Sequence, residues 1–461
     1  MTYPYLTTGN SDFLSGDTAT GLFSLSKNDY VTDMMERLDY HERAPNVAHI
    51  TTYPPRGCGI GTFARDLARA LLIGGHVSRN HIVAIENRGV SEQYQYGTGV
   101  WFTMNQFNLK SYHTAASILN NSDVDVVSLQ HEYGIFGGEW GEYAVDLCRS
   151  LNIPIVTTFH TVLPDPSDKA RIVLSDIANM SHTVVVTIES ARRLLEELYG
   201  VDGRKIRVIP HGAALPERGR VENAKKQLGL GNRTVLATYG LLNPGKGLEY
   251  AINALHSLLG KHKNLMLLIV GQTHPEVQRR EREKYREKLT SLVEQLGLTD
   301  NVRFVNRYLR DDELSLYIQS TDIYLAPYLG QGQVSSGTIT LALAHGKPVV
   351  STPTIFAKEI LSQDRGLFCR FADAESIAEC IDQILHNIRL RRRLERNALA
   401  FGKSVEWGAV AGRYGKIFES ITHDRKTINA LSAITQGCST SHSMSSSIGA
   451  VATQQAVSAA P

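Results

Sequence analysis

Short apolar, β-branched runs alternate with amphipathic stretches along most of the chain. The first six runs are predicted strands, and they cover residues 47–53, 81–86, 124–130, 153–160, 183–188 and 206–212. A second series follows at residues 235–240, 265–271, 302–307, 323–327 and 348–352, with helices predicted between them at 247–259 and 276–296. Strands that alternate with helices are typical of βαβ units and a parallel sheet.

The two series are separated near residues 216–223, where proline, glycine and charged residues cluster. We therefore predict an α/β protein with two doubly wound, Rossmann-like domains at residues 45–218 and 219–404, each of ordinary domain size. The two domains are expected to face a ligand cleft, because open α/β sheets bind ligands beyond the carboxyl ends of their strands. A helix at residues 405–424 is expected to cross back and brace the first domain.

The two ends of the chain lack this pattern. Residues 1–44 show no sustained period of 2 or 3.6, and we predict a flexible arm there. After Lys426 no charged side chain follows, and residues 425–461 are rich in serine, alanine, threonine and glutamine. Such a composition cannot bury a core and predicts a disordered tail.

Composition narrows the class of ligand. The 461 residues include 48 basic and 46 acidic side chains, a formal charge of +2, which gives no bulk electrostatic reason to expect nucleic acid or an anionic membrane as partner. The arginine-rich run 389–396 could meet anionic lipid, but it suits an ordinary amphipathic surface helix better. Small molecules are therefore the expected ligands, and the sequence does not indicate an oligomeric state.

Targeting and redox signals favour an intracellular setting. No stretch approaches the roughly 18 apolar residues of a membrane-spanning helix, and the polar N-terminus lacks the order of a secretory signal. The five cysteines are an odd number at wide spacings, with neither a C-x-x-C pair nor a disulfide framework. We predict a cytoplasmic location.

A glycine-rich loop follows the first predicted strand. Residues 53–62 contain Gly57, Gly59 and Gly61 and lead into an amphipathic helix. Glycines let the backbone approach a ligand, and a helix N-terminus attracts anions, so the loop is a candidate phosphate or sugar site. It is equally consistent with a tight strand-to-helix turn, and its G-x-G-x-G spacing differs from the dinucleotide pattern G-x-G-x-x-G.

Two loops of the second domain suggest a diphosphate. Lys246 begins a helix, where a cation is unfavourable unless an anion offsets it. Ser335, Ser336, Gly337 and Thr338 precede another helix and can present successive amides and hydroxyls to an anion. Taken singly, the lysine reads as a surface residue and the serines as helix caps.

Residues 130–142 are candidates for sugar binding, because they mix glycines, carboxylates and aromatic rings after a strand; under the resemblance given below they would bind the acceptor. We single out His131, Glu132, Glu139 and Trp140, although such a loop can also be a simple turn. Arg56 and His211 lie at the same predicted end of the sheet and are further candidates. The D-x-D spacing at residues 123–125 enters a strand, and we assign no metal to it.

These motifs, in this order, resemble a known family. Y-P-P-R-G-C-G-I-G-T-F, T-T-F-H-T, Y-G-L-L-N-P-G-K-G and the S-G-T loop before L-A-H-G-K-P-V-V-S-T are similar to the GT-B-fold retaining glycosyltransferases of family 4, also called glycosyl transferases group 1, over residues 46–421. The resemblance implies a second domain that binds a nucleoside-diphosphate sugar, a first domain that binds a saccharide or other hydroxyl acceptor, and transfer of a hexosyl group without metal or other cofactor.

The resemblance also implies residue roles. His160 corresponds to the family's active-site histidine beside the transferred sugar, Lys246 to its diphosphate lysine, and Gly59 and Gly61 to its glycine loop near the donor. His160 and Lys246 are therefore the predicted catalytic residues. Lys246, the glycine loop, Gln333 and the 335–338 turn are the predicted donor contacts.

The chain departs from the family pattern at three positions. Leu241 stands where the family usually has an arginine, and Gln333 and Leu341 stand where it has paired glutamates. Gln333 can still hydrogen-bond a sugar hydroxyl, but it carries no charge. The chain would form an atypical subgroup, and two alternatives stay open: a glycoside phosphorylase on the same fold, or a non-catalytic sugar-binding protein on a decayed scaffold.

Overall fold

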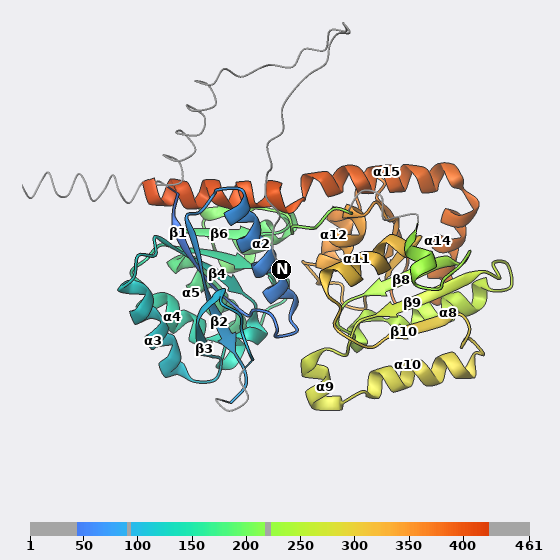
Figure 1. Cartoon of the computed structure of the whole chain (residues 1–461), viewed down its shortest axis with the longest axis horizontal. Helices are drawn as coiled ribbons and strands as arrows, with labels where there is room; N and C mark the ends of the chain where they lie inside the picture. The colour runs from blue at the N-terminus through green and yellow to red at the C-terminus, as the bar shows by residue number, and fades with distance from the viewer. Residues whose placement is uncertain (1–43, 90–93, 217–222, 424–461) are drawn as a thin grey trace, which may run out of the picture. The chain divides into compact units, whose positions relative to one another are not determined.

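A computed structural model describes residues 44–89, 94–216 and 223–423. The predicted arm, apart from Ala44, and the predicted tail at 425–461 lie outside the described residues. Two parallel sheets organise the described part, which confirms the predicted α/β, Rossmann-like fold class (Figure 1).

The first sheet has seven parallel strands in the order β3-β2-β1-β4-β5-β6-β7. The strands are β1 (Asn46–Thr51), β2 (Arg79–Glu86), β3 (Val100–Asn105), β4 (Val126–His131), β5 (Ile155–Phe159), β6 (Thr183–Val186) and β7 (Ile206–Val208). The strand order reverses between β1 and β4, which makes their carboxyl ends the expected ligand site of this sheet.

The second sheet has six parallel strands in the order β10-β9-β8-β11-β12-β13. The strands are β8 (Thr234–Tyr239), β9 (Leu265–Val270), β10 (Val302–Val305), β11 (Ile323–Ala326), β12 (Val349–Ser351) and β13 (Gly366–Phe368). Here the order reverses between β8 and β11. The loop after β8 carries Lys246, and the loop after β11 carries the 335–338 turn.

Two strands were not predicted from the sequence, and one predicted helix is interrupted. The strands β3 and β13 are edge strands that the apolar pattern did not indicate, because β3 has only one buried residue, Met104, and β13 has three residues, none of them buried. The predicted helix 276–296 is two helices, α9 (Pro275–Glu281) and α10 (Lys284–Gln295). Arg282 between them has a φ of 55°, and Glu283 accepts hydrogen bonds from Thr273 and Arg286, so the chain turns there.

Helices cover both faces of the first sheet. The helices α3 (Leu109–Asn120), α4 (Tyr143–Ser150), α5 (Asp168–Met180) and α6 (Glu189–Tyr199) pack on one face and bury apolar side chains such as Leu119, Leu147 and Leu174. The other face is covered by α2 (Gly59–Ile73) and by the helix at residues 407–423. Strands buried on both faces read as continuous apolar runs, which is why they could be located from the sequence.

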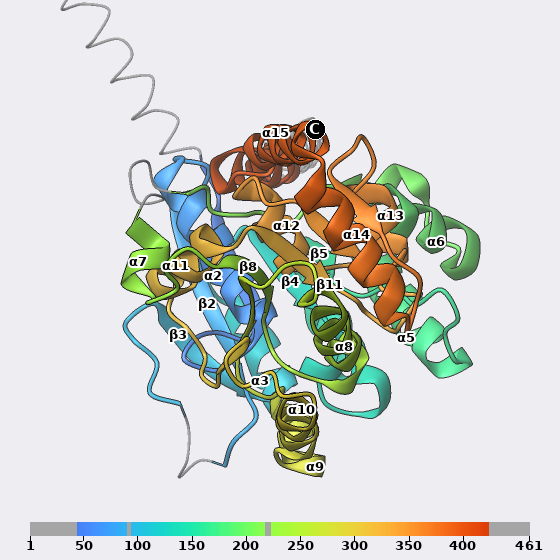
Figure 2. The same cartoon turned by 90° about the vertical axis from the view of Figure 1, so that its right-hand side faces the viewer.

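The second sheet is covered in the same way. On one face lie α8 (Leu248–Leu258), α10 and α14 (Ala374–His386), with α8 and α14 side by side (Figure 2). On the other lie α11 (Asp311–Ser320), α12 (Gly337–Ala344) and α13 (Ile355–Ile360). The short α7 (Ala224–Gln227) leads into β8, and α15 (Ile388–Ser404) packs along α12.

The last described helix returns to the first sheet. Along residues 407–423, the side chains of Val410, Tyr414 and Phe418 are buried against Phe63 of α2 and against valines of the strands. The Tyr414 hydroxyl is 3.0 Å from Thr158 Oγ1 on β5. A segment that follows the second domain in sequence is thus part of the first domain's core.

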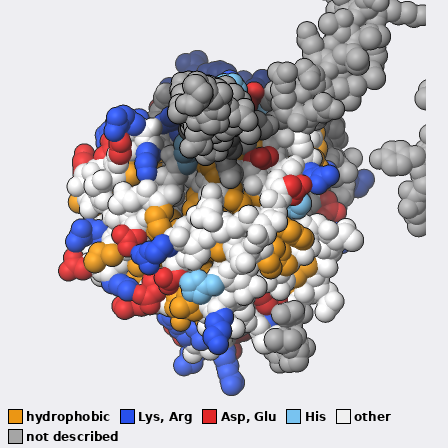
Figure 3. All heavy atoms as spheres, turned by 90° about the vertical axis from the view of Figure 1, so that its left-hand side faces the viewer, with side chains coloured by type: hydrophobic (Ala, Val, Ile, Leu, Met, Phe, Trp, Pro, Cys, Tyr) orange, Lys and Arg blue, Asp and Glu red, His pale blue; other side chains and the backbone are white. Residues whose placement is uncertain are grey.

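The described surface mixes charges of both signs. On the face drawn in Figure 3, basic and acidic side chains of the described residues are interspersed, with apolar side chains between them. None of the described helices is both long and apolar enough to span a bilayer.

We expect Phe418→Ala to lower the free energy of unfolding by about 3–5 kcal/mol, because it opens a cavity in the core that joins the last helix to the first sheet. Chemical denaturation monitored by circular dichroism measures the effect. Glu419→Ala changes the exposed neighbour on the same helix and should change stability little. Equal losses in the two variants would contradict the packing described for Phe418.

Candidate active site

The glycine loop of the first domain brings α2 close to the end of β1. A Cβ on Gly61 would lie 3.0 Å from the carbonyl oxygen of Thr52, so only glycine lets the helix start there without displacement. A Cβ on Gly59 would meet no atom of the described residues within 4 Å. The backbone at Gly59 therefore borders open space at the N-terminus of α2, where a ligand can approach it.

The same loop contacts the second domain. A Cβ on Gly57 would lie 3.0 Å from Gln272 Nε2, in the loop that follows β9. Tyr308 Oη lies 2.7 Å from Thr62 Oγ1, and Arg65 forms a 2.7 Å ion pair with Asp311. The glycine loop is thus held opposite the strand-end loops of the second sheet.

Lys246 lies in the loop after β8, at the end of a short 3₁₀ turn. Its amine donates a 2.8 Å hydrogen bond to the carbonyl oxygen of Tyr239 and lies 5.8 Å from the centre of the Tyr328 ring. The next residue, Gly247, has a φ of 61° and packs so closely on the Pro327 carbonyl that a Cβ would clash. This close packing joins the loop after β8 to the loop after β11.

The turn before α12 contains the predicted serine-lined anion site. Ser336 is the N-cap of α12, and its hydroxyl accepts from the amide of Ile339 at 3.4 Å. Thr338 Oγ1 accepts from Tyr324 Oη at 2.8 Å and lies 3.1 Å from Tyr328 Oη. The cap leaves the first amides of α12 available to a ligand.

The two loops converge at Gly240. A Cβ on Gly240 would lie 3.4 Å from Lys246 Nζ and 3.2 Å from Thr338 Cγ2, and the φ of 99° at this residue favours glycine. The amine of Lys246 and the start of α12 therefore face one another across a residue without a side chain. A cation, a positive helix end and free amides at one point form an anion-binding arrangement.

His160 lies at the carboxyl end of β5, buried against the Phe63 ring at 4.9 Å. Its Nε2 is 2.9 Å from Gln130 Oε1, so the neutral ring donates from Nε2 and keeps Nδ1 as an acceptor. Burial, together with the neighbouring His211 and His131, lowers the pKa of His160 to about 3. The ring is therefore uncharged at neutral pH.

His211 joins the same aromatic group and reaches the second domain. Its Nδ1 lies 2.7 Å from the Gly212 carbonyl, which leaves Nε2 as the acceptor nitrogen, and burial lowers its pKa. A Cβ on Gly337 would lie 2.8 Å from His211 Nε2. A first-domain imidazole thus lies directly against the turn that begins α12.

The acceptor candidates separate into two groups. Arg56 donates to the Ile85 carbonyl at 2.9 Å and to Gln106 Oε1 at 3.2 Å, so it ties the glycine loop to its own sheet. Glu132 accepts from its neighbour's amide at 3.0 Å and from Thr161 Oγ1 at 2.6 Å, and burial raises its pKa. Glu132 therefore holds the loop after β5, immediately beyond His160.

The remaining three acceptor candidates differ in exposure. His131 is fully buried between the rings of Phe136 and Phe159, without a hydrogen-bond partner among the described residues, and gives a sugar no access in this structure. Burial lowers its pKa to about 3. Glu139 and Trp140 are exposed, and Trp140 lies edge-on against Tyr133. Of these three residues, only Glu139 and Trp140 have surface available to a ligand.

Two residues that depart from the family pattern, Gln333 and Leu341, make contacts within the protein. Gln333 donates from its side chain to the Ser335 carbonyl at 2.8 Å, so it shapes the turn before α12. Leu341 is partly buried against the small apolar cluster of Ala213, Ala344 and Val405. A leucine therefore fills a packed position at the junction of the two domains.

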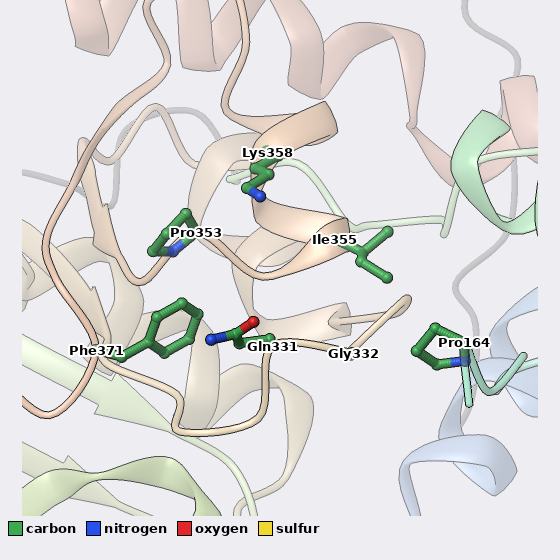
Figure 4. Close-up of a pocket in the computed structure, with 7 residues that line it drawn as sticks. All are labelled: Pro164, Gln331, Gly332, Pro353, Ile355, Lys358 and Phe371. Atoms are coloured by element: carbon green, nitrogen blue, oxygen red, sulfur yellow. The ribbon is translucent and has the colours of Figure 1, made fainter. Parts of the chain in front are cut away.

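A pocket of about 470 Å³ opens beside the turn before α12 (Figure 4). Pro164 and Gly332 border it on one side, and Ile355 and Lys358 of α13, Pro353, Phe371 and Gln331 line the rest. Sequence reasoning missed these residues, as well as Gln272 and Tyr308. The rule that ligand sites follow strand ends would have found Gln272 and Tyr308, because each follows a second-sheet strand.

Three potential metal ligands lie close together elsewhere in the second domain. Asp382 Oδ1 is 2.7 Å from His262 Nε2 and 2.9 Å from His386 Nδ1, and Lys261 Nζ is 3.5 Å from Oδ2. His262 precedes β9, so the group lies at the amino ends of the strands. It is therefore separate from the loops around Lys246.

Two family models match the chain. Residues 57–215 match the model described as Glycosyltransferase Family 4, and residues 220–401 match the one described as Glycosyl transferases group 1. A phosphatidyl-myo-inositol mannosyltransferase of Mycobacterium leprae is 25% identical over 273 residues, 58% of this chain and 67% of the relative. A D-inositol 3-phosphate glycosyltransferase of Acidothermus cellulolyticus is 26% identical over 319 residues, 64% of this chain and 68% of the relative.

A solved structure shares the fold. Anabaena Alr3699/HepE in complex with UDP and glucose matches with a TM-score of 0.64 at 14% identity, over 82% of this chain and all of that chain.

We expect His131→Phe to make stability less sensitive to acid. In the folded chain the pKa of His131 lies below the usual 6.5, so between these two values the unfolded chain binds a proton that the folded chain does not bind. The stability that neutral His131 contributes is therefore lost as pH falls from about 6.5 towards 3. Between pH 8 and pH 5, the free energy of unfolding of the variant should fall by about 2 kcal/mol less than that of the parent chain. Urea denaturation at several pH values measures it. The exposed His182 provides the control, because in His182→Gln the free energy of unfolding should depend on pH as it does in the parent chain.

Proposed function

The chain belongs to the family 4, group 1 glycosyltransferases, and on that premise we propose that it transfers a hexosyl group from a nucleoside-diphosphate sugar to a hydroxyl acceptor with retention. The convergence of Lys246 and the start of α12 at Gly240 carries the proposal. It places a cation and a helix N-terminus at the switch point of the second sheet, where a diphosphate can bind.

The proposed chemistry needs charge stabilisation rather than a metal or other cofactor. The bond between the sugar carbon and the donor phosphate oxygen breaks, and negative charge grows on the diphosphate. Lys246 and the amides of residues 336–338 would stabilise that charge in place, which is the main way such sites lower a barrier. The acceptor hydroxyl would attack the face that the diphosphate leaves, and the departing phosphate oxygen would take its proton.

His160 and His211 would position the sugar rather than exchange protons. Both pKa values are lowered by burial, so both rings are neutral acceptors at physiological pH. The free Nδ1 of His160 would accept a hydrogen bond from a hydroxyl of the transferred sugar. Gly59 and the N-terminus of α2 would contact the donor from the opposite side.

The acceptor side rests on the exposed pair of Glu139 and Trp140. An aromatic face beside a carboxylate suits a polyhydroxyl ring, and the names of the inositol-modifying relatives agree with an acceptor of that class. Glu132 would act indirectly, by holding Thr161 next to His160.

A second candidate is sugar-nucleotide binding without turnover. Leu341 favours it, because this position has no charged group to hold a ribose and instead packs against apolar side chains.

Incubation with a panel of nucleotide sugars and hydroxyl acceptors, followed by product analysis, distinguishes transfer from binding without turnover. Release of free nucleoside diphosphate with a glycosylated product supports transfer. Binding without product supports the second candidate, and consumption of inorganic phosphate would indicate phosphorolysis instead.

We expect Lys246→Ala to lower kcat/KM at least tenfold, about 1.4 kcal/mol of transition-state stabilisation, because the leaving diphosphate loses its cation. Steady-state kinetics with the donor that the product analysis identifies measure the change in kcat/KM. Lys263→Ala removes an exposed lysine of the same domain and should retain full activity. A Lys246→Ala enzyme with unchanged turnover would remove this residue from the mechanism.

A further inference from the structure

A second polar pocket, of about 620 Å³, lies in the second domain away from the Lys246 loops. It is bordered by α7, the end of α11, the turn after α12 and one side of α15. The residues immediately before β11 and β12 contribute to it, so it lies at the amino ends of these strands. Five cations line it: Lys225, Lys347, Arg391, Arg392 and Arg396.

The pocket's two carboxylates neutralise only part of this charge. Asp322 binds Lys225 and Arg391, at 2.5 and 3.1 Å, and also accepts from a β8 amide at 2.7 Å. Glu395 accepts from the same Arg391 at 2.8 Å. Asp322 and Glu395 thus form their ion pairs with Lys225 and Arg391, and Asp322 also accepts a hydrogen bond from the sheet.

Three cations remain without an acidic partner among the described residues. Arg392 and Arg396 are exposed on α15, one turn apart, and form no ion pair there. Lys347 donates to the Gln319 carbonyl at 2.9 Å, and burial lowers its pKa to about 8. No carboxylate of the described residues lies within ion-pair distance of its amine, although Asp322 and Glu395 attract it at longer range.

Two buried acceptors on the pocket wall also lack hydrogen-bond partners within the described part of the chain. The Gln319 side chain is 5% exposed, and its Oε1 has no hydrogen-bond donor. His345 Nδ1 lies 3.0 Å from the Leu341 carbonyl, which makes its unpartnered Nε2 an acceptor. Buried acceptors without donors are rare in folded proteins and indicate that an absent group completes them.

We propose that this pocket binds a phosphomonoester with a hydroxyl-bearing body, such as a sugar phosphate. Lys347, Arg392 and Arg396 supply the positive charge for the phosphate, and Gln319 and His345 supply acceptors for hydroxyls. The volume is in the range of small-molecule sites. The carboxylates Asp322 and Glu395 disfavour a polyanion such as nucleic acid.

The pocket is linked to the proposed donor site by one helix. Gly337 begins α12 at the anion turn, and His345 caps its other end in the pocket. A ligand bound at His345 therefore contacts the helix whose first amides face Lys246, and the two affinities are expected to be coupled reciprocally. This coupling, unlike the pocket itself, rests on the proposed function.

Isothermal titration of the full chain with glucose 6-phosphate tests the site. The parent and Lys246→Ala proteins should bind it alike, because the Lys246 loops are not involved, and glucose should not bind. Arg392→Gln/Arg396→Gln should raise Kd at least tenfold. Arg389→Gln/Lys403→Gln removes equal charge from exposed positions of α15 outside the pocket and should leave Kd unchanged. Absence of binding at millimolar ligand, equal loss in the control, or loss in Lys246→Ala would overturn the proposal.

Vesicles distinguish a lipid phosphate from a free ester. Binding of glucose 6-phosphate without sedimentation on phosphatidic acid vesicles supports a soluble ligand. Sedimentation that depends on Arg392 and Arg396, without binding of the free ester, would overturn the proposal in favour of a lipid headgroup.

The coupling has its own test. A UDP affinity that changes at least twofold with glucose 6-phosphate supports the coupling. An unchanged UDP affinity would contradict the coupling but not the binding site.

Discussion

The approach of Lys246 and the start of α12 to opposite sides of Gly240 is the constraint on which the site depends. Two loops that leave different strands, β8 and β11, can approach this closely because Gly240 and Gly247 have no side chain and adopt positive φ. The resulting point combines an amine with a helix N-terminus in a partly enclosed place. Such a point is unfavourable without an anion, and this is the physical basis of the proposal that a negatively charged ligand binds there.

The first domain is held against this point by contacts between residues of the two domains. Thr62 meets Tyr308, Arg65 pairs with Asp311, and Glu359 of α13 accepts from the amides of Glu189 and Ser190 at the start of α6. These are polar contacts at the ends of helices and loops, whereas the sheets behind them are buried in apolar cores. Such an interface can rearrange at lower cost than the cores, which suits a site that must admit and release a ligand.

The two polar regions of the second domain lie at opposite ends of its strands. Loops at the carboxyl ends carry Lys246 and Ser336, and residues before β11 and β12 line the second pocket. In both regions positive charge exceeds what nearby carboxylates neutralise, although the whole chain is nearly neutral. Net composition therefore conceals local charge, because the opposite charges are separated in the folded chain.

The sequence by itself determined the two series of strands, the glycine loop and a lysine at a helix start, because these depend on local periodicity and on a few residues near one another. It did not reveal the short edge strands β3 and β13 or the turn at Arg282. It also made His131 an acceptor candidate and His160 a catalytic residue, whereas both side chains are buried, the first between Phe136 and Phe159 and the second beside Phe63. Only the tertiary structure shows this burial, because the surroundings of a side chain depend on segments far away in the chain, as when Thr62 meets Tyr308 246 residues later.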